Sequence, residues 1–278
     1  MKEFKDKVAV ITGAASGIGR ALAEHCAQEG TKVVLADVEE AALAQAEQEL
    51  RANGATVLAV RTDVSRAGDI EALAQQTLKA FGAVHLLVNN AGVGAGGEIW
   101  ESTLPDWEWV IGVNLWGIIH GLRTFVPIML AQDTEGYIVN TASIAGLLPY
   151  HPAAPYQVTK HAVVALSEHL YYSLAQRQAK VKVSVLCPGW VNTRIMDSWR
   201  NRPEALQNEP QAVPASPEQE AVVQSMRAAA EAGLPPRQVA DQVFDAIRKE
   251  QFYILTHPEL NAVIQQRMEN ILQQRNPT

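Results

Sequence analysis

Short apolar runs alternate along the chain with longer stretches in which apolar residues recur every three or four positions. The short runs are rich in Val, Ile and Leu and predict strands at residues 7–12, 32–37, 56–61, 85–89, 137–141, 181–186 and 252–255. The longer stretches predict helices at residues 18–29, 39–52, 70–81, 105–130, 156–175, 238–249 and 258–274. Inside the predicted helix 105–130, Pro127 predicts a kink, and Asn114, a poor helix former, predicts a local bend or a water site.

Strands that alternate with helices form βαβ units, which assemble into a parallel sheet. The strands are almost continuously apolar, so helices are expected to cover both faces of this sheet. Right-handed crossovers then give a doubly wound α/β fold. Sheets of this kind often form one unit at this length, so we expect a single domain over residues 1–278.

The regular pattern stops between residues 199 and 237, which are rich in Pro, Gln, Glu and Ala. Long irregular segments inside compact domains are usually functional or disordered. One interpretation is a mobile surface insertion. We favour the other, in which residues 196–237 form a lid over a binding site and residues 238–278 close the fold as helix, strand and helix.

Composition and charge narrow the class of protein. The 278 residues are 47% hydrophobic and 19% charged, which is typical of a globular protein. The net charge of −7 comes without a basic cluster and argues against nucleic-acid binding. We find no apolar run near 18 residues and no leader-like start, so we expect neither a membrane span nor a signal peptide. Two cysteines are too few for a disulfide framework, and a cytoplasmic location is expected.

A glycine-rich loop separates the first strand from the first helix. Its spacing is G-x-x-x-G-x-G, and its position between strand and helix favours a dinucleotide pyrophosphate bound at the helix N-terminus. Asp37 ends the second strand, where a carboxylate can accept hydrogen bonds from the adenosine ribose and repel a 2′-phosphate. We therefore expect NAD rather than NADP. The loop residues assigned to the cofactor are Gly13, Ser16, Gly17, Ile18 and Gly19.

The central part of the chain contains three residues that suggest acid–base chemistry. Tyr156 and Lys160 are four residues apart on a predicted helix and so share one face. A neighbouring ammonium and a positive nicotinamide favour the phenolate of Tyr156, which would act as base in alcohol oxidation and as acid in ketone reduction. Ser143 follows the fifth strand, where ligands of open α/β sheets bind, and can stabilise charge on a substrate oxygen.

Together these motifs resemble the short-chain dehydrogenase/reductase family. The resemblance rests on Thr12–Gly19, Asp63-Val64, Asn89-Asn90-Ala91-Gly92, Asn114, Ser143, Tyr156-x-x-x-Lys160 and Pro188-Gly189 followed by Thr193. It covers roughly residues 5–195 and the closing helix and strand, and leaves residues 199–237 unassigned. It implies a one-domain Rossmann fold with a seven-stranded parallel sheet, and a homotetramer or homodimer.

The resemblance also implies roles for individual residues. Asn114 would hold a water that relays protons, and Lys160 would bind the nicotinamide ribose. Asp63 and Val64 would bracket the adenine. Contacts to the rest of the cofactor are implied for Asn90, Ala91, Gly92, Pro188, Gly189, Val191 and Thr193. His85 stands where the family often has Asp, and Trp190 adds bulk near the nicotinamide.

The expected reaction is NAD-dependent interconversion of a secondary alcohol and a ketone. The substrate pocket is assigned to Gly94, Ala145, His151, Trp190, Met196 and Trp199. This set has no Arg or Lys, so a neutral, hydrophobic substrate is favoured over a carboxylate or phosphate. The alternatives are an NADPH-dependent carbonyl reductase and a catalytically idle dinucleotide sensor. The seven histidines lack metal-ligand spacing, and no metal is expected.

Overall fold

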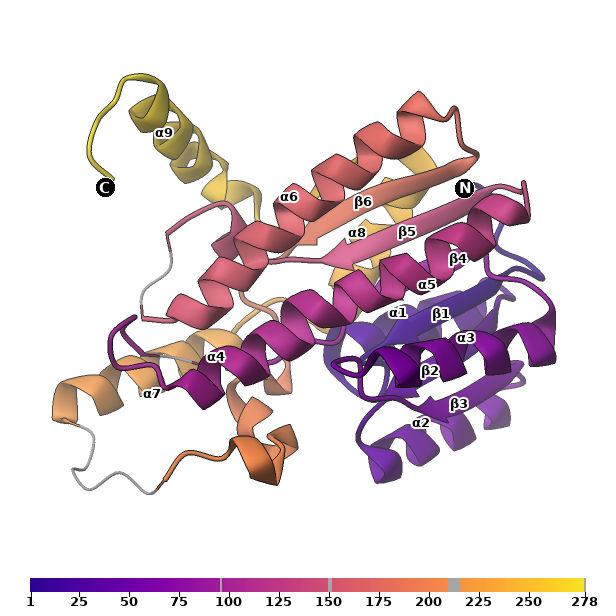
Figure 1. The fold of residues 1–278 in the computed structure, drawn as a ribbon, viewed down its shortest axis with the longest axis horizontal. Helices are drawn as coiled ribbons and strands as arrows, with labels where there is room; N and C mark the ends of the chain where they lie inside the picture. Colours follow the sequence, from indigo (N-terminus) through magenta and orange to yellow (C-terminus); the bar gives the residue numbers. More distant parts are fainter. Residues whose placement is uncertain (96, 150–151, 210–215, 278) are drawn as a thin grey trace.

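Seven parallel strands form one sheet in the order β3-β2-β1-β4-β5-β6-β7 (Figure 1). The computed structural model describes residues 1–95, 97–149, 152–209 and 216–277. The strands are β1 (Val8–Thr12), β2 (Lys32–Asp37), β3 (Val57–Arg61), β4 (Leu86–Asn89), β5 (Gly136–Thr141), β6 (Val181–Cys187) and β7 (Tyr253–Leu255). The strand order reverses between β1 and β4, which places a topological switch point at the carboxyl ends of these strands. The predicted doubly wound parallel sheet is confirmed.

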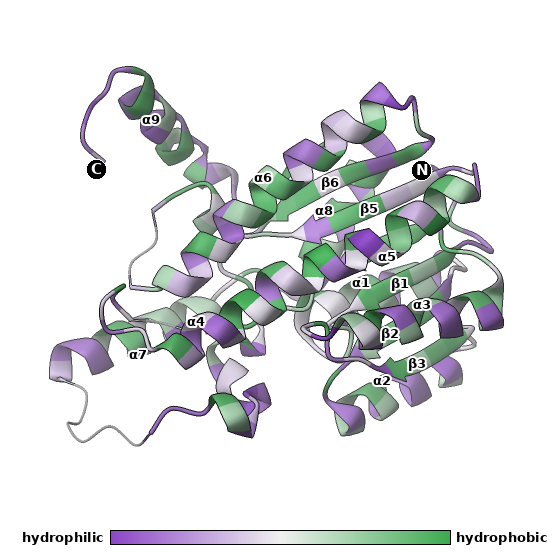
Figure 2. Cartoon of the chain, viewed as in Figure 1, coloured by the Kyte–Doolittle hydropathy of each residue, from purple (hydrophilic) through white to green (hydrophobic). Residues whose placement is uncertain are grey.

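Helices cover both faces of the sheet (Figure 1). They are α1 (Gly17–Gln28), α2 (Glu40–Ala52), α3 (Ala67–Phe81), α4 (Leu104–Ile111), α5 (Gly117–Ala131), α6 (Ala154–Gln176), α7 (Pro217–Glu231), α8 (Pro236–Lys249) and α9 (Asn261–Leu272). One core joins the sheet to α1, α2 and α8 through residues such as Leu22, Leu43 and Phe244. The other joins it to α3, α5 and α6 through Ile70, Phe125 and Val163. The strands are mostly apolar along their length, as a sheet buried on both faces requires (Figure 2).

The segment expected as one helix over residues 105–130 is interrupted. A π-helical turn, Gly112–Trp116, separates α4 from α5 and contains Asn114, which confirms the irregularity expected there. Pro127 lies inside α5, which continues to Ala131, so the break lies at the π-helical turn. π-helical turns are often found at functional sites.

The same segment bears on the expectation that the chain has no membrane span, which stays a prediction. Leu104–Ala131 is long and apolar enough to cross a membrane by length and composition alone. One such helix is weak support for a membrane span, because the core helix of a soluble protein passes the same test. In this fold Ile118, Phe125 and Met129 of α5 are buried in the second core.

The segment expected to lack regular structure contains a helix. After a 3-10 stretch, Arg194–Asn201, and a single 3-10 turn, Glu204–Leu206, the fifteen-residue α7 begins at Pro217. The Ser216 hydroxyl accepts from the Gln219 amide while the Gln219 side chain accepts from the Ser216 amide, which forms a capping box. This capping box was the sequence signal for α7.

Candidate active site

The glycine loop packs so closely that side chains are excluded from it. A Cβ on Gly19 would lie 2.1 Å from the Gly13 carbonyl oxygen, and one on Gly13 would lie 2.8 Å from the Ala91 Cα. Gly13 and Gly17 also have positive φ angles of 66° and 55°, which favour glycine. Gly19 therefore serves the packing of α1 against the loop, whereas Gly13, Ser16, Gly17 and Ile18 line the large cleft above the sheet.

The N-terminus of α1 has the properties of an anion site. Its cap residue, Ser16, makes no side-chain hydrogen bond to the first turn, so the amides there are not capped by that side chain. A free helix N-terminus with a positive dipole end suits a pyrophosphate. A Cβ on Gly17 would meet the Thr193 methyl group at 3.0 Å, so Thr193 lies directly beside this end of the helix.

Asp37 lines the cleft, and each of its carboxylate oxygens accepts a hydrogen bond from a backbone amide. Its Oδ2 accepts from the Ala15 amide at 2.9 Å and its Oδ1 from the Glu39 amide at 3.0 Å. Burial raises the pKa of Asp37, and the backbone hydrogen bonds partly offset the rise. Each oxygen retains acceptor capacity, which fits two ribose hydroxyls.

The next strand contributes Asp63 and Val64 to the same side of the cleft. Asp63 Oδ1 accepts from both the amide and the hydroxyl of Ser65, at 3.0 and 2.7 Å. Val64 is buried, and a Cβ on Gly117 would lie 2.7 Å from its Cγ2, so the valine also packs against the start of α5.

Asn90 connects three strand ends below the cofactor site. Its Nδ2 donates to the Thr12 carbonyl at 3.1 Å, and its Oδ1 accepts from the Thr141 hydroxyl at 3.3 Å. The amides of Asn90 and Ala91 both donate to Thr12 Oγ1. These bonds fix the ends of β1, β4 and β5 relative to one another, so Asn90 acts mainly by positioning the loop.

Ser143, Tyr156 and Lys160 are brought together by the packing of a short turn on α6. Ser143 caps the 3-10 turn Ile144–Gly146 by accepting from the Ala145 amide at 3.1 Å. A Cβ on Gly146 would lie 2.6 Å from the Lys160 carbonyl oxygen, so this turn lies against α6. The Lys160 ammonium lies 5.4 Å from the centre of the Tyr156 ring, and Ser143 hydrogen-bonds the Tyr156 hydroxyl.

The pKa of Tyr156 differs in direction from the sequence-based expectation. Burial raises the pKa of the Tyr156 phenol, and the hydrogen bond with Ser143 only partly offsets this rise. Burial also lowers the pKa of Lys160 to about 8. Lys160 Nζ donates to the Thr141 carbonyl at 3.0 Å. Burial thus opposes the phenolate, whereas a positive charge beside the ring would favour it.

Asn114 is fully buried in the π-helical turn, and its side chain is committed to protein partners. Its Oδ1 accepts from the Val93 amide at 2.8 Å, and its Nδ2 donates to the Val93 carbonyl at 2.9 Å and to Thr159 at 3.3 Å. These contacts hold the loop after β4 against α6. The water relay implied for Asn114 stays a prediction.

His257 was not assigned a role by sequence reasoning, and it fixes the turn after β6. Its Nδ1 accepts from the Gly189 amide at 3.1 Å, so its Nε2 carries the proton and donates to the Trp190 carbonyl at 3.1 Å. A Cβ on Gly189 would lie 2.8 Å from the His257 ring, which explains the glycine. The sequence contains no local signal for this contact between segments 68 residues apart.

One continuous cleft of about 2520 Å³ joins these groups. Its lining includes Asn90, Ala91, Gly92, Pro188, Gly189, Val191 and Thr193 of the expected cofactor site and Gly94, Ala145, Trp190 and Met196 of the expected pocket. The structure does not bring Trp199 to this lining, because its side chain is 70% exposed. The 3-10 stretch that carries Met196 and Trp199 is kinked at Asp197, whose backbone is not helical. His151 lies outside the described residues.

The segment expected as a lid and the C-terminal segment supply residues of the cleft lining that were not assigned from the sequence. Val222, Val223 and Met226 of α7 line the cleft, together with Leu206. Leu260 of the segment after β7 lines it from the other direction. Over the ranges that the structure describes, no group of three or more His, Cys, Asp or Glu is placed to hold a metal.

Comparison with known proteins agrees with this geometry. A sequence model described as short chain dehydrogenase matches residues 7–204. A "CLA biosynthesis dehydrogenase/reductase" from Lactiplantibacillus plantarum is 37% identical over 277 residues, covering 98% of this chain and 95% of its own. A C alpha-dehydrogenase from a Sphingobium strain is 33% identical, covering 98% and 87%. The crystal structure of a short chain dehydrogenase/reductase from Burkholderia phymatum in complex with NAD has a TM-score of 0.96 and 53% identity, covering 100% of this chain and 98% of that one.

Proposed function

The chain belongs to the short-chain dehydrogenase/reductase family, and from that premise we propose that it is an NAD-dependent oxidoreductase that interconverts a neutral, hydrophobic secondary alcohol and its ketone. The observation that carries the proposal is the cluster of Ser143, Tyr156 and Lys160 at one end of the dinucleotide-type cleft. A relative with NAD bound supports the choice of cofactor.

In the proposed oxidation, the substrate hydroxyl lies between Ser143 and Tyr156. The Tyr156 phenolate takes the hydroxyl proton while the carbinol carbon loses a hydride, and Ser143 stabilises the developing charge on oxygen. A bound nicotinamide supplies the hydride acceptor in oxidation and the hydride donor in reduction. The Lys160 ammonium, 5.4 Å from the Tyr156 ring, favours the phenolate and is assigned to the nicotinamide ribose.

Selection of NAD over NADP is assigned to Asp37. We expect Asp37→Asn to raise the KM for NAD about tenfold and to improve the use of NADP, because the variant loses the charge that repels a 2′-phosphate. Steady-state kinetics with both cofactors measure the ratio of kcat/KM values. Asp241→Asn, on the surface of α8, is the control and should leave this ratio unchanged. An unchanged ratio in Asp37→Asn, or a wild-type protein that turns over only with NADP, would favour the NADPH-dependent carbonyl reductase.

The substrate class is supported by apolar residues in the lining of the cleft, which include Ala145, Met196, Leu206, Val223 and Met226. Arg194 and Arg200 also line the cleft, and Arg200 is paired with Glu39. We propose that α7 and the segment before it act as the lid, and that an apolar alcohol binds beneath them.

The test is NADH formation by the purified protein with a panel of neutral secondary alcohols of increasing size. Turnover should favour the apolar members. Val223→Glu, which places a charge in the proposed lid, should raise the KM for these substrates at least tenfold. Val263→Glu on the exposed face of α9 is the matched control. Equal turnover of carboxylate-bearing alcohols, or equal effects of the two variants, would contradict this substrate class.

Two further expectations remain part of the proposal. We propose a homotetramer or homodimer located in the cytoplasm. A catalytically idle sensor is the alternative from another class, and it requires NAD binding without turnover of any member of the panel.

A further inference from the structure

The segment that follows β6 crosses the cleft. We call residues Arg194–Asn201 the strap. It begins directly after Thr193, which lies beside the N-terminus of α1, and its far end contacts Glu39, which follows β2. In the sheet, β1, β4 and β5 lie between β2 and β6. Four strand spacings of about 4.8 Å correspond to roughly 19 Å, so residues 188–201, which end in the strap, span the carboxyl ends of the strands at which dinucleotides bind.

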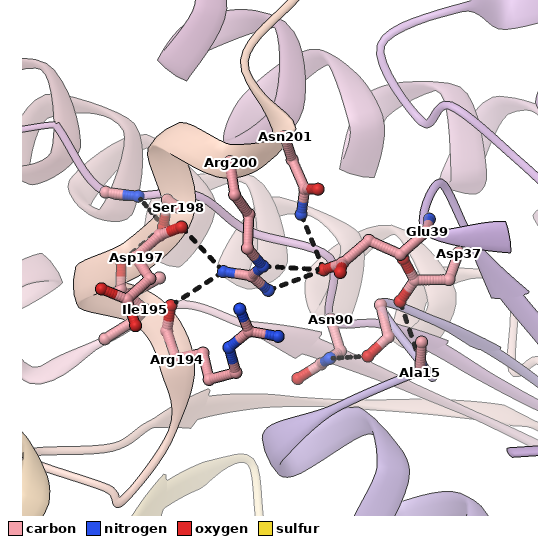
Figure 3. A network of polar contacts seen from close by, with 12 residues as sticks. Ala15, Asp37, Glu39, Asn90, Arg194, Ile195, Asp197, Ser198, Arg200 and Asn201 are labelled. Atoms are coloured by element: carbon pink, nitrogen blue, oxygen red, sulfur yellow. Dashed lines mark hydrogen bonds and ion pairs between the residues drawn. The ribbon is translucent and has the colours of Figure 1, made fainter. Parts of the chain in front are cut away.

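The strap is fastened to Glu39 by three hydrogen bonds to one carboxylate oxygen (Figure 3). Arg200 donates to Glu39 Oε1 from Nη2 at 2.6 Å and from Nε at 3.1 Å, and Asn201 donates from Nδ2 at 2.9 Å. The side chains of Arg200 and Glu39 are only 18% and 21% exposed. Partial burial raises the pKa of Glu39, but the hydrogen bonds from Arg200 and Asn201 outweigh it and lower the pKa overall.

Both residues of the pair make further hydrogen bonds that hold them in place. Arg200 Nη1 also donates to the carbonyls of Arg194 and Asp197, so the guanidinium holds the strap together while it contacts Glu39 (Figure 3). The Glu39 amide donates to Asp37 Oδ1, so the residue that receives the strap is joined to the residue assigned to the adenosine ribose.

Two further contacts hold the strap region across the cleft. The Gly94 amide, after β4, donates to Ser198 Oγ at 3.0 Å. Arg202, directly after the strap, pairs with Asp106 of α4 at 2.6 Å. These contacts lie toward the substrate end of the cleft, whereas the Glu39 pair lies at the adenosine end. A cofactor beneath the strap is thus enclosed at the adenosine end by the Glu39–Arg200 pair.

We propose that the ion pair between Glu39 and Arg200 is a latch that retains the bound dinucleotide by fastening the strap across the cleft. The two residues act as positioning residues, because neither is assigned a contact with the reacting atoms. The inference rests on the proposed function for the identity of the cofactor. It goes beyond that function by assigning the rate of cofactor release to a contact between residues 161 positions apart.

The test measures the dissociation rate of NADH by stopped-flow fluorescence. We expect Glu39→Ala and Arg200→Ala each to accelerate release about tenfold, because breaking a desolvated charge pair acts mainly on dissociation. The charge-swapped double variant, Glu39→Arg with Arg200→Glu, should restore slow release at least in part. In the cofactor-free single variants, amide hydrogen exchange should rise in residues 194–208.

The matched control is Glu29→Ala, which breaks the pair between Glu29 and Arg248. That pair has side chains 33% and 35% exposed and joins α1 to α8 away from the cleft. Glu29→Ala should leave the rate of NADH release unchanged. An acceleration equal to that of the latch variants would overturn the latch, because it would show a general loosening of the fold. Release rates within twofold of wild type in both latch variants, with lowered thermal stability, would also overturn it.

Failure of the proposed cofactor is distinguishable from failure of the latch. A wild-type protein that binds NADPH but not NADH would overturn the NAD assignment, and the same release experiment with NADPH would then decide on the latch. A wild-type protein that binds neither cofactor would overturn both.

Discussion

Tyr156→Phe is expected to lower kcat for alcohol oxidation by about 10²–10⁴-fold, the range typical of a positioned general base. The variant loses one hydroxyl, which is the group that hydrogen-bonds Ser143 and takes the substrate proton in the proposed mechanism. Binding of NADH, measured by fluorescence titration, should change less than threefold. A large fall in kcat with nearly unchanged NADH binding would show that the variant loses the chemical step and keeps the cofactor site.

The control for this variant is Tyr137→Phe. Tyr137 is fully buried in β5, and its hydroxyl lies 2.8 Å from Ser184 Oγ, away from the cleft. Removing that hydroxyl should lower the free energy of unfolding by about 1 kcal/mol and leave kcat unchanged. Near-wild-type turnover in Tyr156→Phe would remove Tyr156 from the mechanism. No turnover in the wild type with any substrate, despite NADH binding, would support the sensor alternative.

Lys160→Met is expected to make the protein more stable near pH 7 while abolishing turnover. Lys160 is only 3% exposed, and burial lowers its pKa from 10.5 to about 8. The folded protein therefore pays a desolvation cost whenever this amine is charged, and the shift corresponds to about 3 kcal/mol. Methionine has a similar length and no charge to desolvate.

The stability gain of Lys160→Met should depend on pH, because the pKa of Lys160 is lowered in the folded protein. Between pH 8 and 10.5 the unfolded chain still binds the Lys160 proton and the folded protein has released it, so wild-type stability rises with pH. The advantage of Lys160→Met should thus be greatest below pH 8 and shrink towards pH 10.5. Chemical denaturation across this range measures it. Lys182→Met, at an exposed position of β6, is the control, and a pH-independent difference for Lys160→Met would contradict the argument.

The strands and the sheet order follow closely from the sequence. Each strand is a short apolar run between helical segments, and the parallel topology follows from that alternation. The second strand was placed at residues 32–37, and β2 is Lys32–Asp37. The family motifs also predicted that Ser143, Tyr156 and Lys160 would lie together, and the packing of Gly146 on α6 supplies the reason.

The features that the sequence did not reveal depend on contacts between distant segments. The strap pairs with a residue 161 positions away, and His257 binds a turn 68 positions away. Neither contact has a local pattern. The kink in the strap lies at one non-helical residue, Asp197, which no sequence pattern marks. For α7 a local signal was present in the capping box at Ser216, but proline-rich surroundings masked it.

The dependence of the Gly189 turn on His257 has a consequence for synthesis. The turn that carries Pro188 and Gly189 leaves the ribosome 68 residues before the histidine that holds it. At about 5–20 residues per second, this delay is roughly 3 to 14 s. During that time the glycine loop and β1–β6 are already synthesised, but the turn proposed to bind the nicotinamide lacks the histidine that holds it. A nascent chain stopped before residue 257 should bind the adenosine half of the cofactor and lack a fixed nicotinamide site.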